Sequence, residues 1–209
     1  MISKQGHNRP TSVKEFSIPE DYTVQRILVF VKNTLPKFET IIKQSKSSLY
    51  KEDDISKELF RYLGDIAREE NLLFQFNEKK GVDFTVYVHP FQFGAQPLFM
   101  IEAKRLCKTS YDYVSGRNGG IERIKREQDD FGKHLNNGAI VGYIQDENQI
   151  YWERKINRWI DDLISRETDI VWDLKDKIVP NTPNSTYKSE HSRISKQKIE
   201  IHHFWINLN

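Results

Sequence analysis

The sequence predicts an α/β fold, and three observations support this fold class. Two runs rich in β-branched and aromatic residues, Val82–Val88 and Leu98–Ala103, flank a turn-prone segment at 90–97, which is the composition of a β-hairpin. Segments with helical spacing of apolar residues lie on both sides of this hairpin. A further apolar run, Ala139–Ile144, is typical of a buried strand.

Length and composition favour one globular unit. The chain has 209 residues, enough for a single core, and 30% of them are charged. The net charge of +2 does not by itself indicate a polyanion as partner. We expect no membrane span and no signal peptide, because no long apolar run is present. Since Cys107 is the single cysteine, an internal disulfide is excluded and a cytoplasmic location is expected.

Residues 1–48 are expected to form a helical arm. Ser17 and Glu20 have capping-box spacing, and apolar residues from Val24 to Leu35 follow with helical periodicity. Pro36 is expected to end or kink this helix, and a second helical piece follows it. We expect the arm to pack on the core; a basic surface facing DNA is the less favoured alternative.

Residues 49–146 are expected to form the core, which begins with a helix from Glu52 to Glu70. Its apolar stripe contains residues 55, 59, 63 and 66. On a helical wheel Glu52 projects within this stripe, whereas Glu58 lies at its border. The strand Leu72–Phe76 follows the helix and precedes the hairpin.

The hairpin brings charged residues together at one end. If the chain folds back near residue 93, residues whose numbers sum to 185 or 186 lie opposite each other, so Asp83 arrives beside Glu102 and Ala103. Lys104 shares a strand face with Glu102 because side chains alternate. Buried charges are costly unless they pair or hold a cation, so this end of the sheet is a candidate site for a divalent metal ion.

The next helix is expected to carry a polar residue into the core. Its stripe contains the five residues Ile121, Ile124, Gln128, Phe131 and Leu135. A buried amide must find hydrogen-bond partners, and the charged end of the hairpin could supply them. The alternative, about equally weighted, is a core glutamine satisfied by the backbone.

Residues 147–209 are expected to form an extension packed on the core. It contains an amphipathic helix, Tyr151–Ser165, and a pair of strands, Tyr187–Ile194 and Ile199–Leu208. His202 and His203 are adjacent on a strand and therefore point to opposite faces, so we expect them to be packing or surface residues and not zinc ligands.

The hairpin carries the resemblance to a known family. Asp83, eighteen intervening residues and then Glu102-Ala103-Lys104 at the end of an apolar strand resemble the motif of the PD-(D/E)XK nuclease superfamily, the fold shared by many restriction endonucleases and Holliday-junction resolvases. The likeness covers roughly residues 50–146 and includes the order α-β-β-β-α-β; it departs from the motif at Val82, where the family has proline. It implies a restriction endonuclease-like core, in which a mixed central sheet is flanked by helices.

The resemblance also implies roles for individual residues. Asp83, Glu102 and the Ala103 carbonyl would bind Mg²⁺, for which Mn²⁺ can substitute, and Lys104 would act on the attacking water or the transition state. Glu52 and Gln128 would complete the catalytic site. Four basic residues are candidates for contacts with the nucleic-acid backbone: Arg105, Arg117, Arg123 and Lys125.

The expected function is metal-dependent DNA cleavage. By family analogy the setting is restriction or anti-phage defence, with DNA repair second, and RNA stays open as a substrate. Double-strand cleavage by this fold commonly uses a dimer, which leaves room for a homodimer or a larger defence complex. The alternatives are a catalytically inactive nuclease-fold module that binds nucleic acid or serves assembly, and, ranked last, a structural ion network.

Overall fold

The computed structural model describes residues 20–45, 51–77, 81–90, 93–107, 111–116, 119–128, 132–166, 168–181 and 186–209. Its α-helices are α1 (Glu20–Gln44), α2 (Glu52–Ala67), α3 (Gly120–Lys125) and α4 (Gln149–Ile164). Its strands are β1 (Leu72–Phe76), β2 (Phe84–Val88), β3 (Phe99–Leu106), β4 (Asn137–Ile144), β5 (Val179–Asn181), β6 (Thr186–Ser192) and β7 (Lys198–Asn207). Short 3₁₀ helices include η2 (Tyr111–Tyr113) and η4 (Leu174–Asp176).

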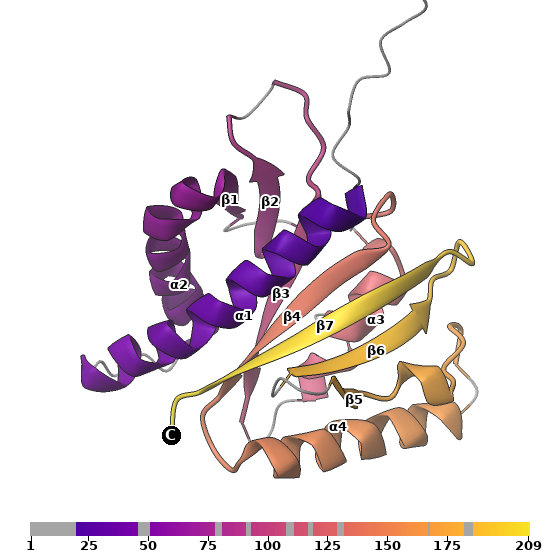
Figure 1. The fold of residues 1–209 in the computed structure, drawn as a ribbon. Helices are drawn as coiled ribbons and strands as arrows, with labels where there is room; N and C mark the ends of the chain where they lie inside the picture. The colour runs from indigo at the N-terminus through magenta and orange to yellow at the C-terminus, as the bar shows by residue number, and fades with distance from the viewer. Residues whose placement is uncertain are drawn as a thin grey trace, which may run out of the picture.

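The strands form one mixed sheet of seven strands, in the order β1-β2-β3-β4-β7-β6-β5 (Figure 1). The pairs β1–β2 and β2–β3 are antiparallel, whereas β4 is parallel to both β3 and β7. In the hairpin Phe84 lies opposite Ile101, so paired residue numbers sum to 185 as the sequence predicts. The predicted order α-β-β-β-α-β is observed from Glu52 to Ile144.

Helices cover both faces of the sheet and make a three-layer α/β structure (Figure 1). Apolar side chains of α1 and α2 pack on one face, against residues such as Ile101, Val141 and Phe204. Those of α3 and α4 pack on the other face, against residues such as Leu106 and Ile140. Within the described residues, no helix is both long and apolar enough for a bilayer.

The sequence predicts that Pro36 ends or kinks the helix, and the first of these alternatives is wrong, because α1 continues through Pro36. Proline removes one backbone donor, which leaves the carbonyl four residues earlier without its helical bond. Pro36 is exposed and lies between the buried residues Leu35 and Phe38, so the unpaired carbonyl is on the solvent side of the helix. Water can therefore satisfy it while the apolar face stays packed.

The two C-terminal strands pair with each other, as expected, and they also belong to the main sheet. β7 pairs with β4 over the full length of that strand, from Asn137 opposite Glu200 to Ile144 opposite Asn207. β6 then pairs with β7, and the three-residue strand β5 extends the edge. The apolar run of β4 is buried on both faces because it has a strand on each side and helices above and below.

The helix α3 is much shorter than the predicted stripe from residue 121 to 135. Glu127 has a φ of 53°, the left-handed conformation that commonly ends helices. The carbonyl of Lys125 accepts a hydrogen bond from Ile194 N–H at 2.9 Å, and Ser195 Oγ donates to Glu127 Oε1 at 2.7 Å. The chain after α3 is therefore held by the turn between β6 and β7.

Candidate active site

The candidate site lies where β2 and β3 separate. Among the described residues, β2 pairs with β3 only as far as Ile101, so the next backbone groups on that side of β3 need other partners. Ala103 N–H donates to Asp83 Oδ2 at 2.7 Å. Arg105 N–H donates to Glu52 Oε2 at 2.8 Å. Two carboxylates thus occupy the place of the missing strand, and the main chain holds both.

Glu102 and Lys104 alternate with these residues along β3, so their side chains project toward α3. Glu102 is only 1% exposed, and its Oε1 accepts from Lys104 Nζ and from Arg123 Nη1, each at 2.8 Å. Its Oε2 is buried and finds no hydrogen-bond donor in the part of the chain that the structure describes. One carboxylate oxygen is therefore doubly paired, whereas the other is buried without a compensating donor among the described residues.

Lys104 contacts two acidic side chains, Glu102 and Glu52. Its Nζ lies 2.8 Å from Glu102 Oε1 and 3.5 Å from Glu52 Oε1. Burial by itself lowers the pKa of Lys104, but Glu102, Glu52 and Asp83 together outweigh burial and raise it. The side chain therefore remains an ammonium ion at neutral pH.

Asp83 is the most perturbed acid of this cluster. Burial, followed by the negative charge of Glu102, raises its pKa to about 7, although Lys104 and the bond from Ala103 N–H act in the opposite direction. Burial is therefore the main reason that Asp83 holds its proton more tightly than a carboxylic acid in water, and the charge of Glu102 adds to it. A perturbed acid of this kind is characteristic of functional sites, and it is also found in structural ion networks.

The first turn of α2 brings Glu52 to the site. Ile55 is buried beneath this turn, and Ser56 Oγ lies 3.0 Å from Tyr143 OH of β4, so the turn is fixed over the end of the sheet. Glu58 lies further along the helix and pairs with Arg61 on the exposed side. The structure thus brings together Glu52 and not Glu58 with Lys104, as the helical wheel indicates.

The first turn of α3 closes the site from the other side. Arg123 places Nη1 on Glu102 and donates from Nη2 to the Gly81 carbonyl at 2.9 Å. Gly120 lies against Lys104, and a Cβ at this position would be 3.3 Å from Lys104 Cγ. Glycine is therefore suited to position 120, because the helix approaches the lysine stem closely.

Two predicted residues lie elsewhere. Gln128 is exposed and not buried under the sheet, because α3 ends at Lys125 and the chain then turns toward the β6–β7 hairpin. Lys125 is 1% exposed and paired with Asp176 at 2.5 Å, so it cannot meet a nucleic acid at the surface. Arg105 has a partly buried side chain, and Arg117 lies outside the described residues.

The sequence does not predict the pairing of Arg123 with Glu102, because it offers Arg123 only as a candidate for contacts with the nucleic-acid backbone. The available signal was the charge balance of the hairpin. A glutamate buried at the end of β3 needs cationic partners, and Lys104 supplies one of them. The adjacent glycines at 119 and 120 allow α3 to come close enough to supply the second.

The donor set fits a hard divalent cation. Across the described residues, no group of three or more His, Cys, Asp or Glu side chains is arranged to hold a metal ion unaided. Magnesium does not require such a group, because it is usually bound by one or two carboxylates, with water and substrate oxygens completing the shell. The unpartnered Oε2 of Glu102 and the nearby Asp83 carboxylate match this requirement.

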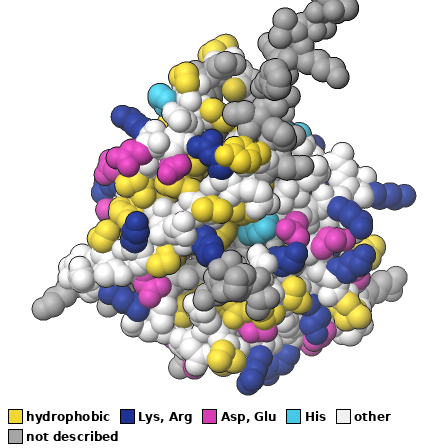
Figure 2. Space-filling model, viewed as in Figure 1, with side chains coloured by type: hydrophobic (Ala, Val, Ile, Leu, Met, Phe, Trp, Pro, Cys, Tyr) yellow, Lys and Arg dark blue, Asp and Glu magenta, His cyan; other side chains and the backbone are white. Residues whose placement is uncertain are grey.

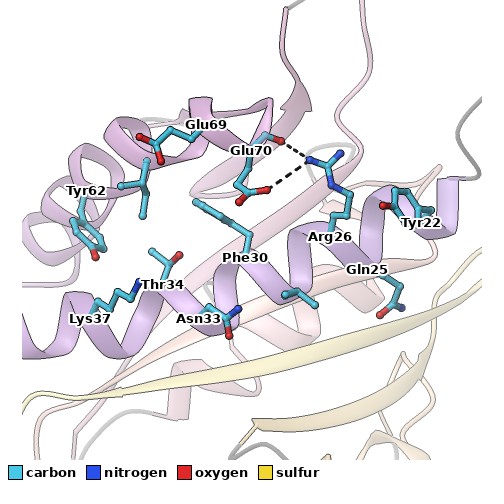
Figure 3. A pocket seen from close by; sticks show the side chains of 12 residues that line it. Tyr22, Gln25, Arg26, Phe30, Asn33, Thr34, Lys37, Tyr62, Glu69 and Glu70 are labelled. Carbon is cyan, nitrogen blue, oxygen red and sulfur yellow. Dashed lines mark hydrogen bonds and ion pairs between the residues drawn. The ribbon is translucent and has the colours of Figure 1, made fainter.

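A separate cavity lies between α1 and α2 (Figure 3). Its volume is about 580 Å³, and Arg26 bridges it by donating to the Glu70 carbonyl at 2.6 Å. None of the residues of the Asp83–Glu102 cluster lines it. On the face shown in Figure 2 basic and acidic side chains are interspersed, so this view offers no surface of a single charge.

We compared the chain with models of protein families, with curated proteins and with solved structures, and none of these comparisons gave a match.

Proposed function

We propose that the chain is a Mg²⁺-dependent deoxyribonuclease of the PD-(D/E)XK type, which hydrolyses phosphodiester bonds in DNA. The observation that carries the proposal is the buried Glu102, whose Oε2 lacks a donor among the described residues while two cations lie on Oε1. Such an oxygen is costly to bury unless a cation meets it. The element order from α2 to β4, with β3 and β4 parallel, supports a restriction endonuclease-like core.

Each residue of the site has a role in this proposal. Asp83 and Glu102 would hold Mg²⁺ together with the Ala103 carbonyl and water. The ion, when bound, supplies a water of lowered pKa and polarises the phosphate. Lys104 remains an ammonium beside Glu102, where it orients the attacking water and offsets charge that develops on the phosphate oxygens. Glu52 holds this ammonium from the opposite side.

The test is plasmid nicking by Lys104→Met. We expect wild-type protein to nick supercoiled DNA with Mg²⁺ and not with EDTA, and the variant to be slower by about 100-fold or more, since it lacks the charge at the reacting phosphate. The matched control is Lys188→Met, which removes a half-exposed lysine that pairs with Glu200 on β7. Linear DNA, single-stranded DNA and RNA in parallel identify the substrate. Full activity of Lys104→Met would refute the assignment.

A second candidate function is a nuclease-fold module that binds nucleic acid without cleaving it. One observation favours it: Lys104 and Arg123 already place two cations on Glu102, so this carboxylate is neutralised without a metal ion. Salt-sensitive DNA binding with no cleavage under Mg²⁺ or Mn²⁺ would establish this alternative.

The biological setting that fits a DNA-cleaving activity of this kind is restriction of foreign DNA. We expect cells that express the wild-type chain to plate fewer phage than cells that express Lys104→Met at the same protein level. Equal phage plating on both kinds of cell would contradict a role in defence, but it would not contradict the proposed nuclease activity.

A further inference from the structure

A chain of buried polar side chains runs behind α3, outside the cluster described above. Lys125 Nζ and His191 Nδ1 each lie 2.5 Å from Asp176 Oδ1. His191 Nε2 lies 2.6 Å from Ser189 Oγ. All four residues are at most 3% exposed. These four side chains join the end of α3 to η4 and β6.

The hydrogen-bonded chain of side chains continues from β6 across β7 to η2. Ser189 Oγ lies 2.7 Å from His203 Nε2, and His203 Nδ1 lies 2.8 Å from Tyr113 OH. Trp205 Nε1 donates to the same Tyr113 oxygen at 3.0 Å. These residues are also buried. A continuous hydrogen-bonded path therefore links the C-terminal end of α3 with η2 through the two C-terminal strands.

The chemistry of the two ends determines the direction of every bond. The Asp176 carboxylate can only accept, so His191 donates from Nδ1 and its neutral ring accepts Ser189 O–H at Nε2. Ser189 then accepts from His203 Nε2–H. The Trp205 indole can only donate, so Tyr113 accepts from it and donates its own proton to His203 Nδ1. Burial lowers the pKa of both histidines, which agrees with neutral rings.

Ser189, His191 and Asp176 have the same connectivity as the catalytic triad of serine hydrolases. A nucleophile must be reached by its substrate, however, and Ser189 is 3% exposed while His191 is fully buried. We therefore assign no hydrolase activity to these three residues, and their role must be mediated by the elements they connect.

Both ends of this hydrogen-bonded chain of side chains attach to the segment that closes the candidate site. Tyr113 lies at the start of this segment and Lys125 at its end. Between them, Glu122 N–H donates to the Val114 carbonyl at 2.9 Å and closes the segment on itself. The same segment carries Arg123, which contacts Glu102. It also carries Gly120, which contacts Lys104.

We infer that the hydrogen-bonded chain from Lys125 to Trp205 is a positioning device, which holds η2 and α3 from behind and so sets Arg123 on Glu102 and α3 on Lys104. The geometric part of this inference depends only on the structure; its effect on catalysis rests on the proposed nuclease function. Ser189 is the most informative residue, because it lies at the middle of the chain and on a strand that is not part of the site.

The experiment compares Ser189→Ala with wild-type protein by two readouts. The first is the NMR signal of the Arg123 guanidinium, identified by its absence in Arg123→Lys, whose slow N–H exchange reports the pairing with Glu102. The second is kcat and KM for plasmid nicking with Mg²⁺ well below the melting temperature. We expect faster guanidinium exchange and a kcat reduced by about tenfold with KM little changed, because misplaced groups slow the chemical step. Ser189→Thr restores the hydroxyl and should restore both.

Two controls separate positioning from loss of stability. Ile27→Val removes one methylene group from the core beneath α1 and should lower the melting temperature without changing the hydrogen-bonded chain. Ser192→Ala removes an exposed hydroxyl from the same strand. If Ser189→Ala fails to fold, Tyr113→Phe breaks the chain at its other end. Guanidinium exchange in Ser189→Ala or Tyr113→Phe equal to that in Ile27→Val would overturn the inference. An inactive wild-type protein would instead refute the nuclease function, and the NMR readout would still decide the positioning role.

Discussion

Asp83 accepts a hydrogen bond from Ala103 N–H at 2.7 Å, an interaction that favours the ionised carboxylate. Its pKa is nevertheless raised to about 7, because burial and the nearby Glu102 outweigh this bond. A side chain held firmly in an unfavourable charge state is a source of instability in the metal-free chain. Residues of this kind are typical of sites in which function, and not stability, determines the side chain.

We expect Asp83→Asn to stabilise the metal-free chain above pH 7. The amide oxygen can still accept from Ala103 N–H, and the carboxylate charge is gone. Because the folded-state pKa of Asp83 is raised from 3.8 to about 7, the wild-type protein loses stability as pH rises through this window, whereas the variant does not. The gain at pH 8 should be about 1 kcal/mol or more, or roughly 2–4 °C in Tm.

The measurement is thermal unfolding in EDTA at pH 5, 6, 7 and 8. Asp65→Asn serves as the control, since Asp65 is exposed on α2 and its change should leave the pH profile as in wild type. An Asp83→Asn variant that is equally or less stable than wild type at pH 8 would contradict the electrostatic account of the site.

At the residue scale the sequence was most informative where side-chain alternation and turn position are the controlling factors. The hairpin register placed Asp83 beside Ala103, and the wheel of α2 favoured Glu52, because both follow from local geometry. The predicted burial of Gln128 was wrong because the helix ends early. Its end, at the left-handed backbone of Glu127, depends on a non-local contact, since the β6–β7 turn holds the polypeptide there. No periodicity in the sequence records that contact.

At the scale of elements, β4 is the strand around which the two halves of the sheet join. It pairs in parallel with β3, which carries the site, and with β7, which carries part of the buried hydrogen-bonded chain. Gly142 lies opposite Trp205 in this pairing, and the indole ring occupies the space that a side chain at 142 would need. The sequence predicted β4 and β7 as strands but not that they are neighbours, since pairing between segments so far apart along the chain leaves no local pattern.

Gly142→Ala should therefore destabilise the protein. Its Cβ would lie 2.6 Å from Trp205 Cδ1 and 2.8 Å from Leu106 Cδ1, so both side chains must shift. We expect a loss of about 1–3 kcal/mol in the free energy of unfolding, as is usual for overpacking in a core. Urea unfolding measures this loss. The control is Gly64→Ala in α2, where a Cβ meets nothing within 4 Å and alanine favours the helix.

Wild-type stability of Gly142→Ala would mean that β4 and β7 are not packed as described. Gly64→Ala should be at least as stable as wild type, and this result would show that the loss at position 142 arises from the contact with Trp205 and Leu106 and not from the type of substitution.

At the scale of the whole molecule, two cores lie on opposite faces of one sheet, and polar groups are buried in the core on the α3 and α4 side. The described parts of the three segments expected from the sequence (1–48, 49–146 and 147–209) pack together around this sheet, since β7 pairs with β4 and α1 packs against both α2 and β7. Composition could not reveal this, because the C-terminal strands have the same apolar and polar mixture whether they form an isolated pair or, as observed, a pair that is joined to β4.

Buried neutral histidines predict acid sensitivity of the whole fold. Burial lowers the pKa of His191 and of His203 below 6.5, so the folded state binds fewer protons than the unfolded state. The stability that these rings contribute is full above about pH 6.5 and is lost as pH falls. In the Asp83→Asn background, which removes the opposing trend, we expect the urea midpoint to decrease steadily from pH 6.5 to pH 5.

The control for this prediction is His134→Gln, because His134 is exposed and hydrogen-bonded to the Pro97 carbonyl. It should leave the slope unchanged. A midpoint that is constant between pH 7 and pH 5 would show that the two rings are not held neutral in the fold.

The most direct test of the central claim is Mg²⁺-dependent cleavage by wild type and Glu102→Gln, assayed side by side on supercoiled plasmid. Glutamine retains the oxygen that meets Lys104 and Arg123 but replaces the unpartnered Oε2 with an amide nitrogen, which cannot bind a metal ion. We predict nicking by wild type that EDTA abolishes and loss of nicking in the variant. No cleavage by wild type with Mg²⁺ or Mn²⁺, or equal cleavage by Glu102→Gln, would contradict the account.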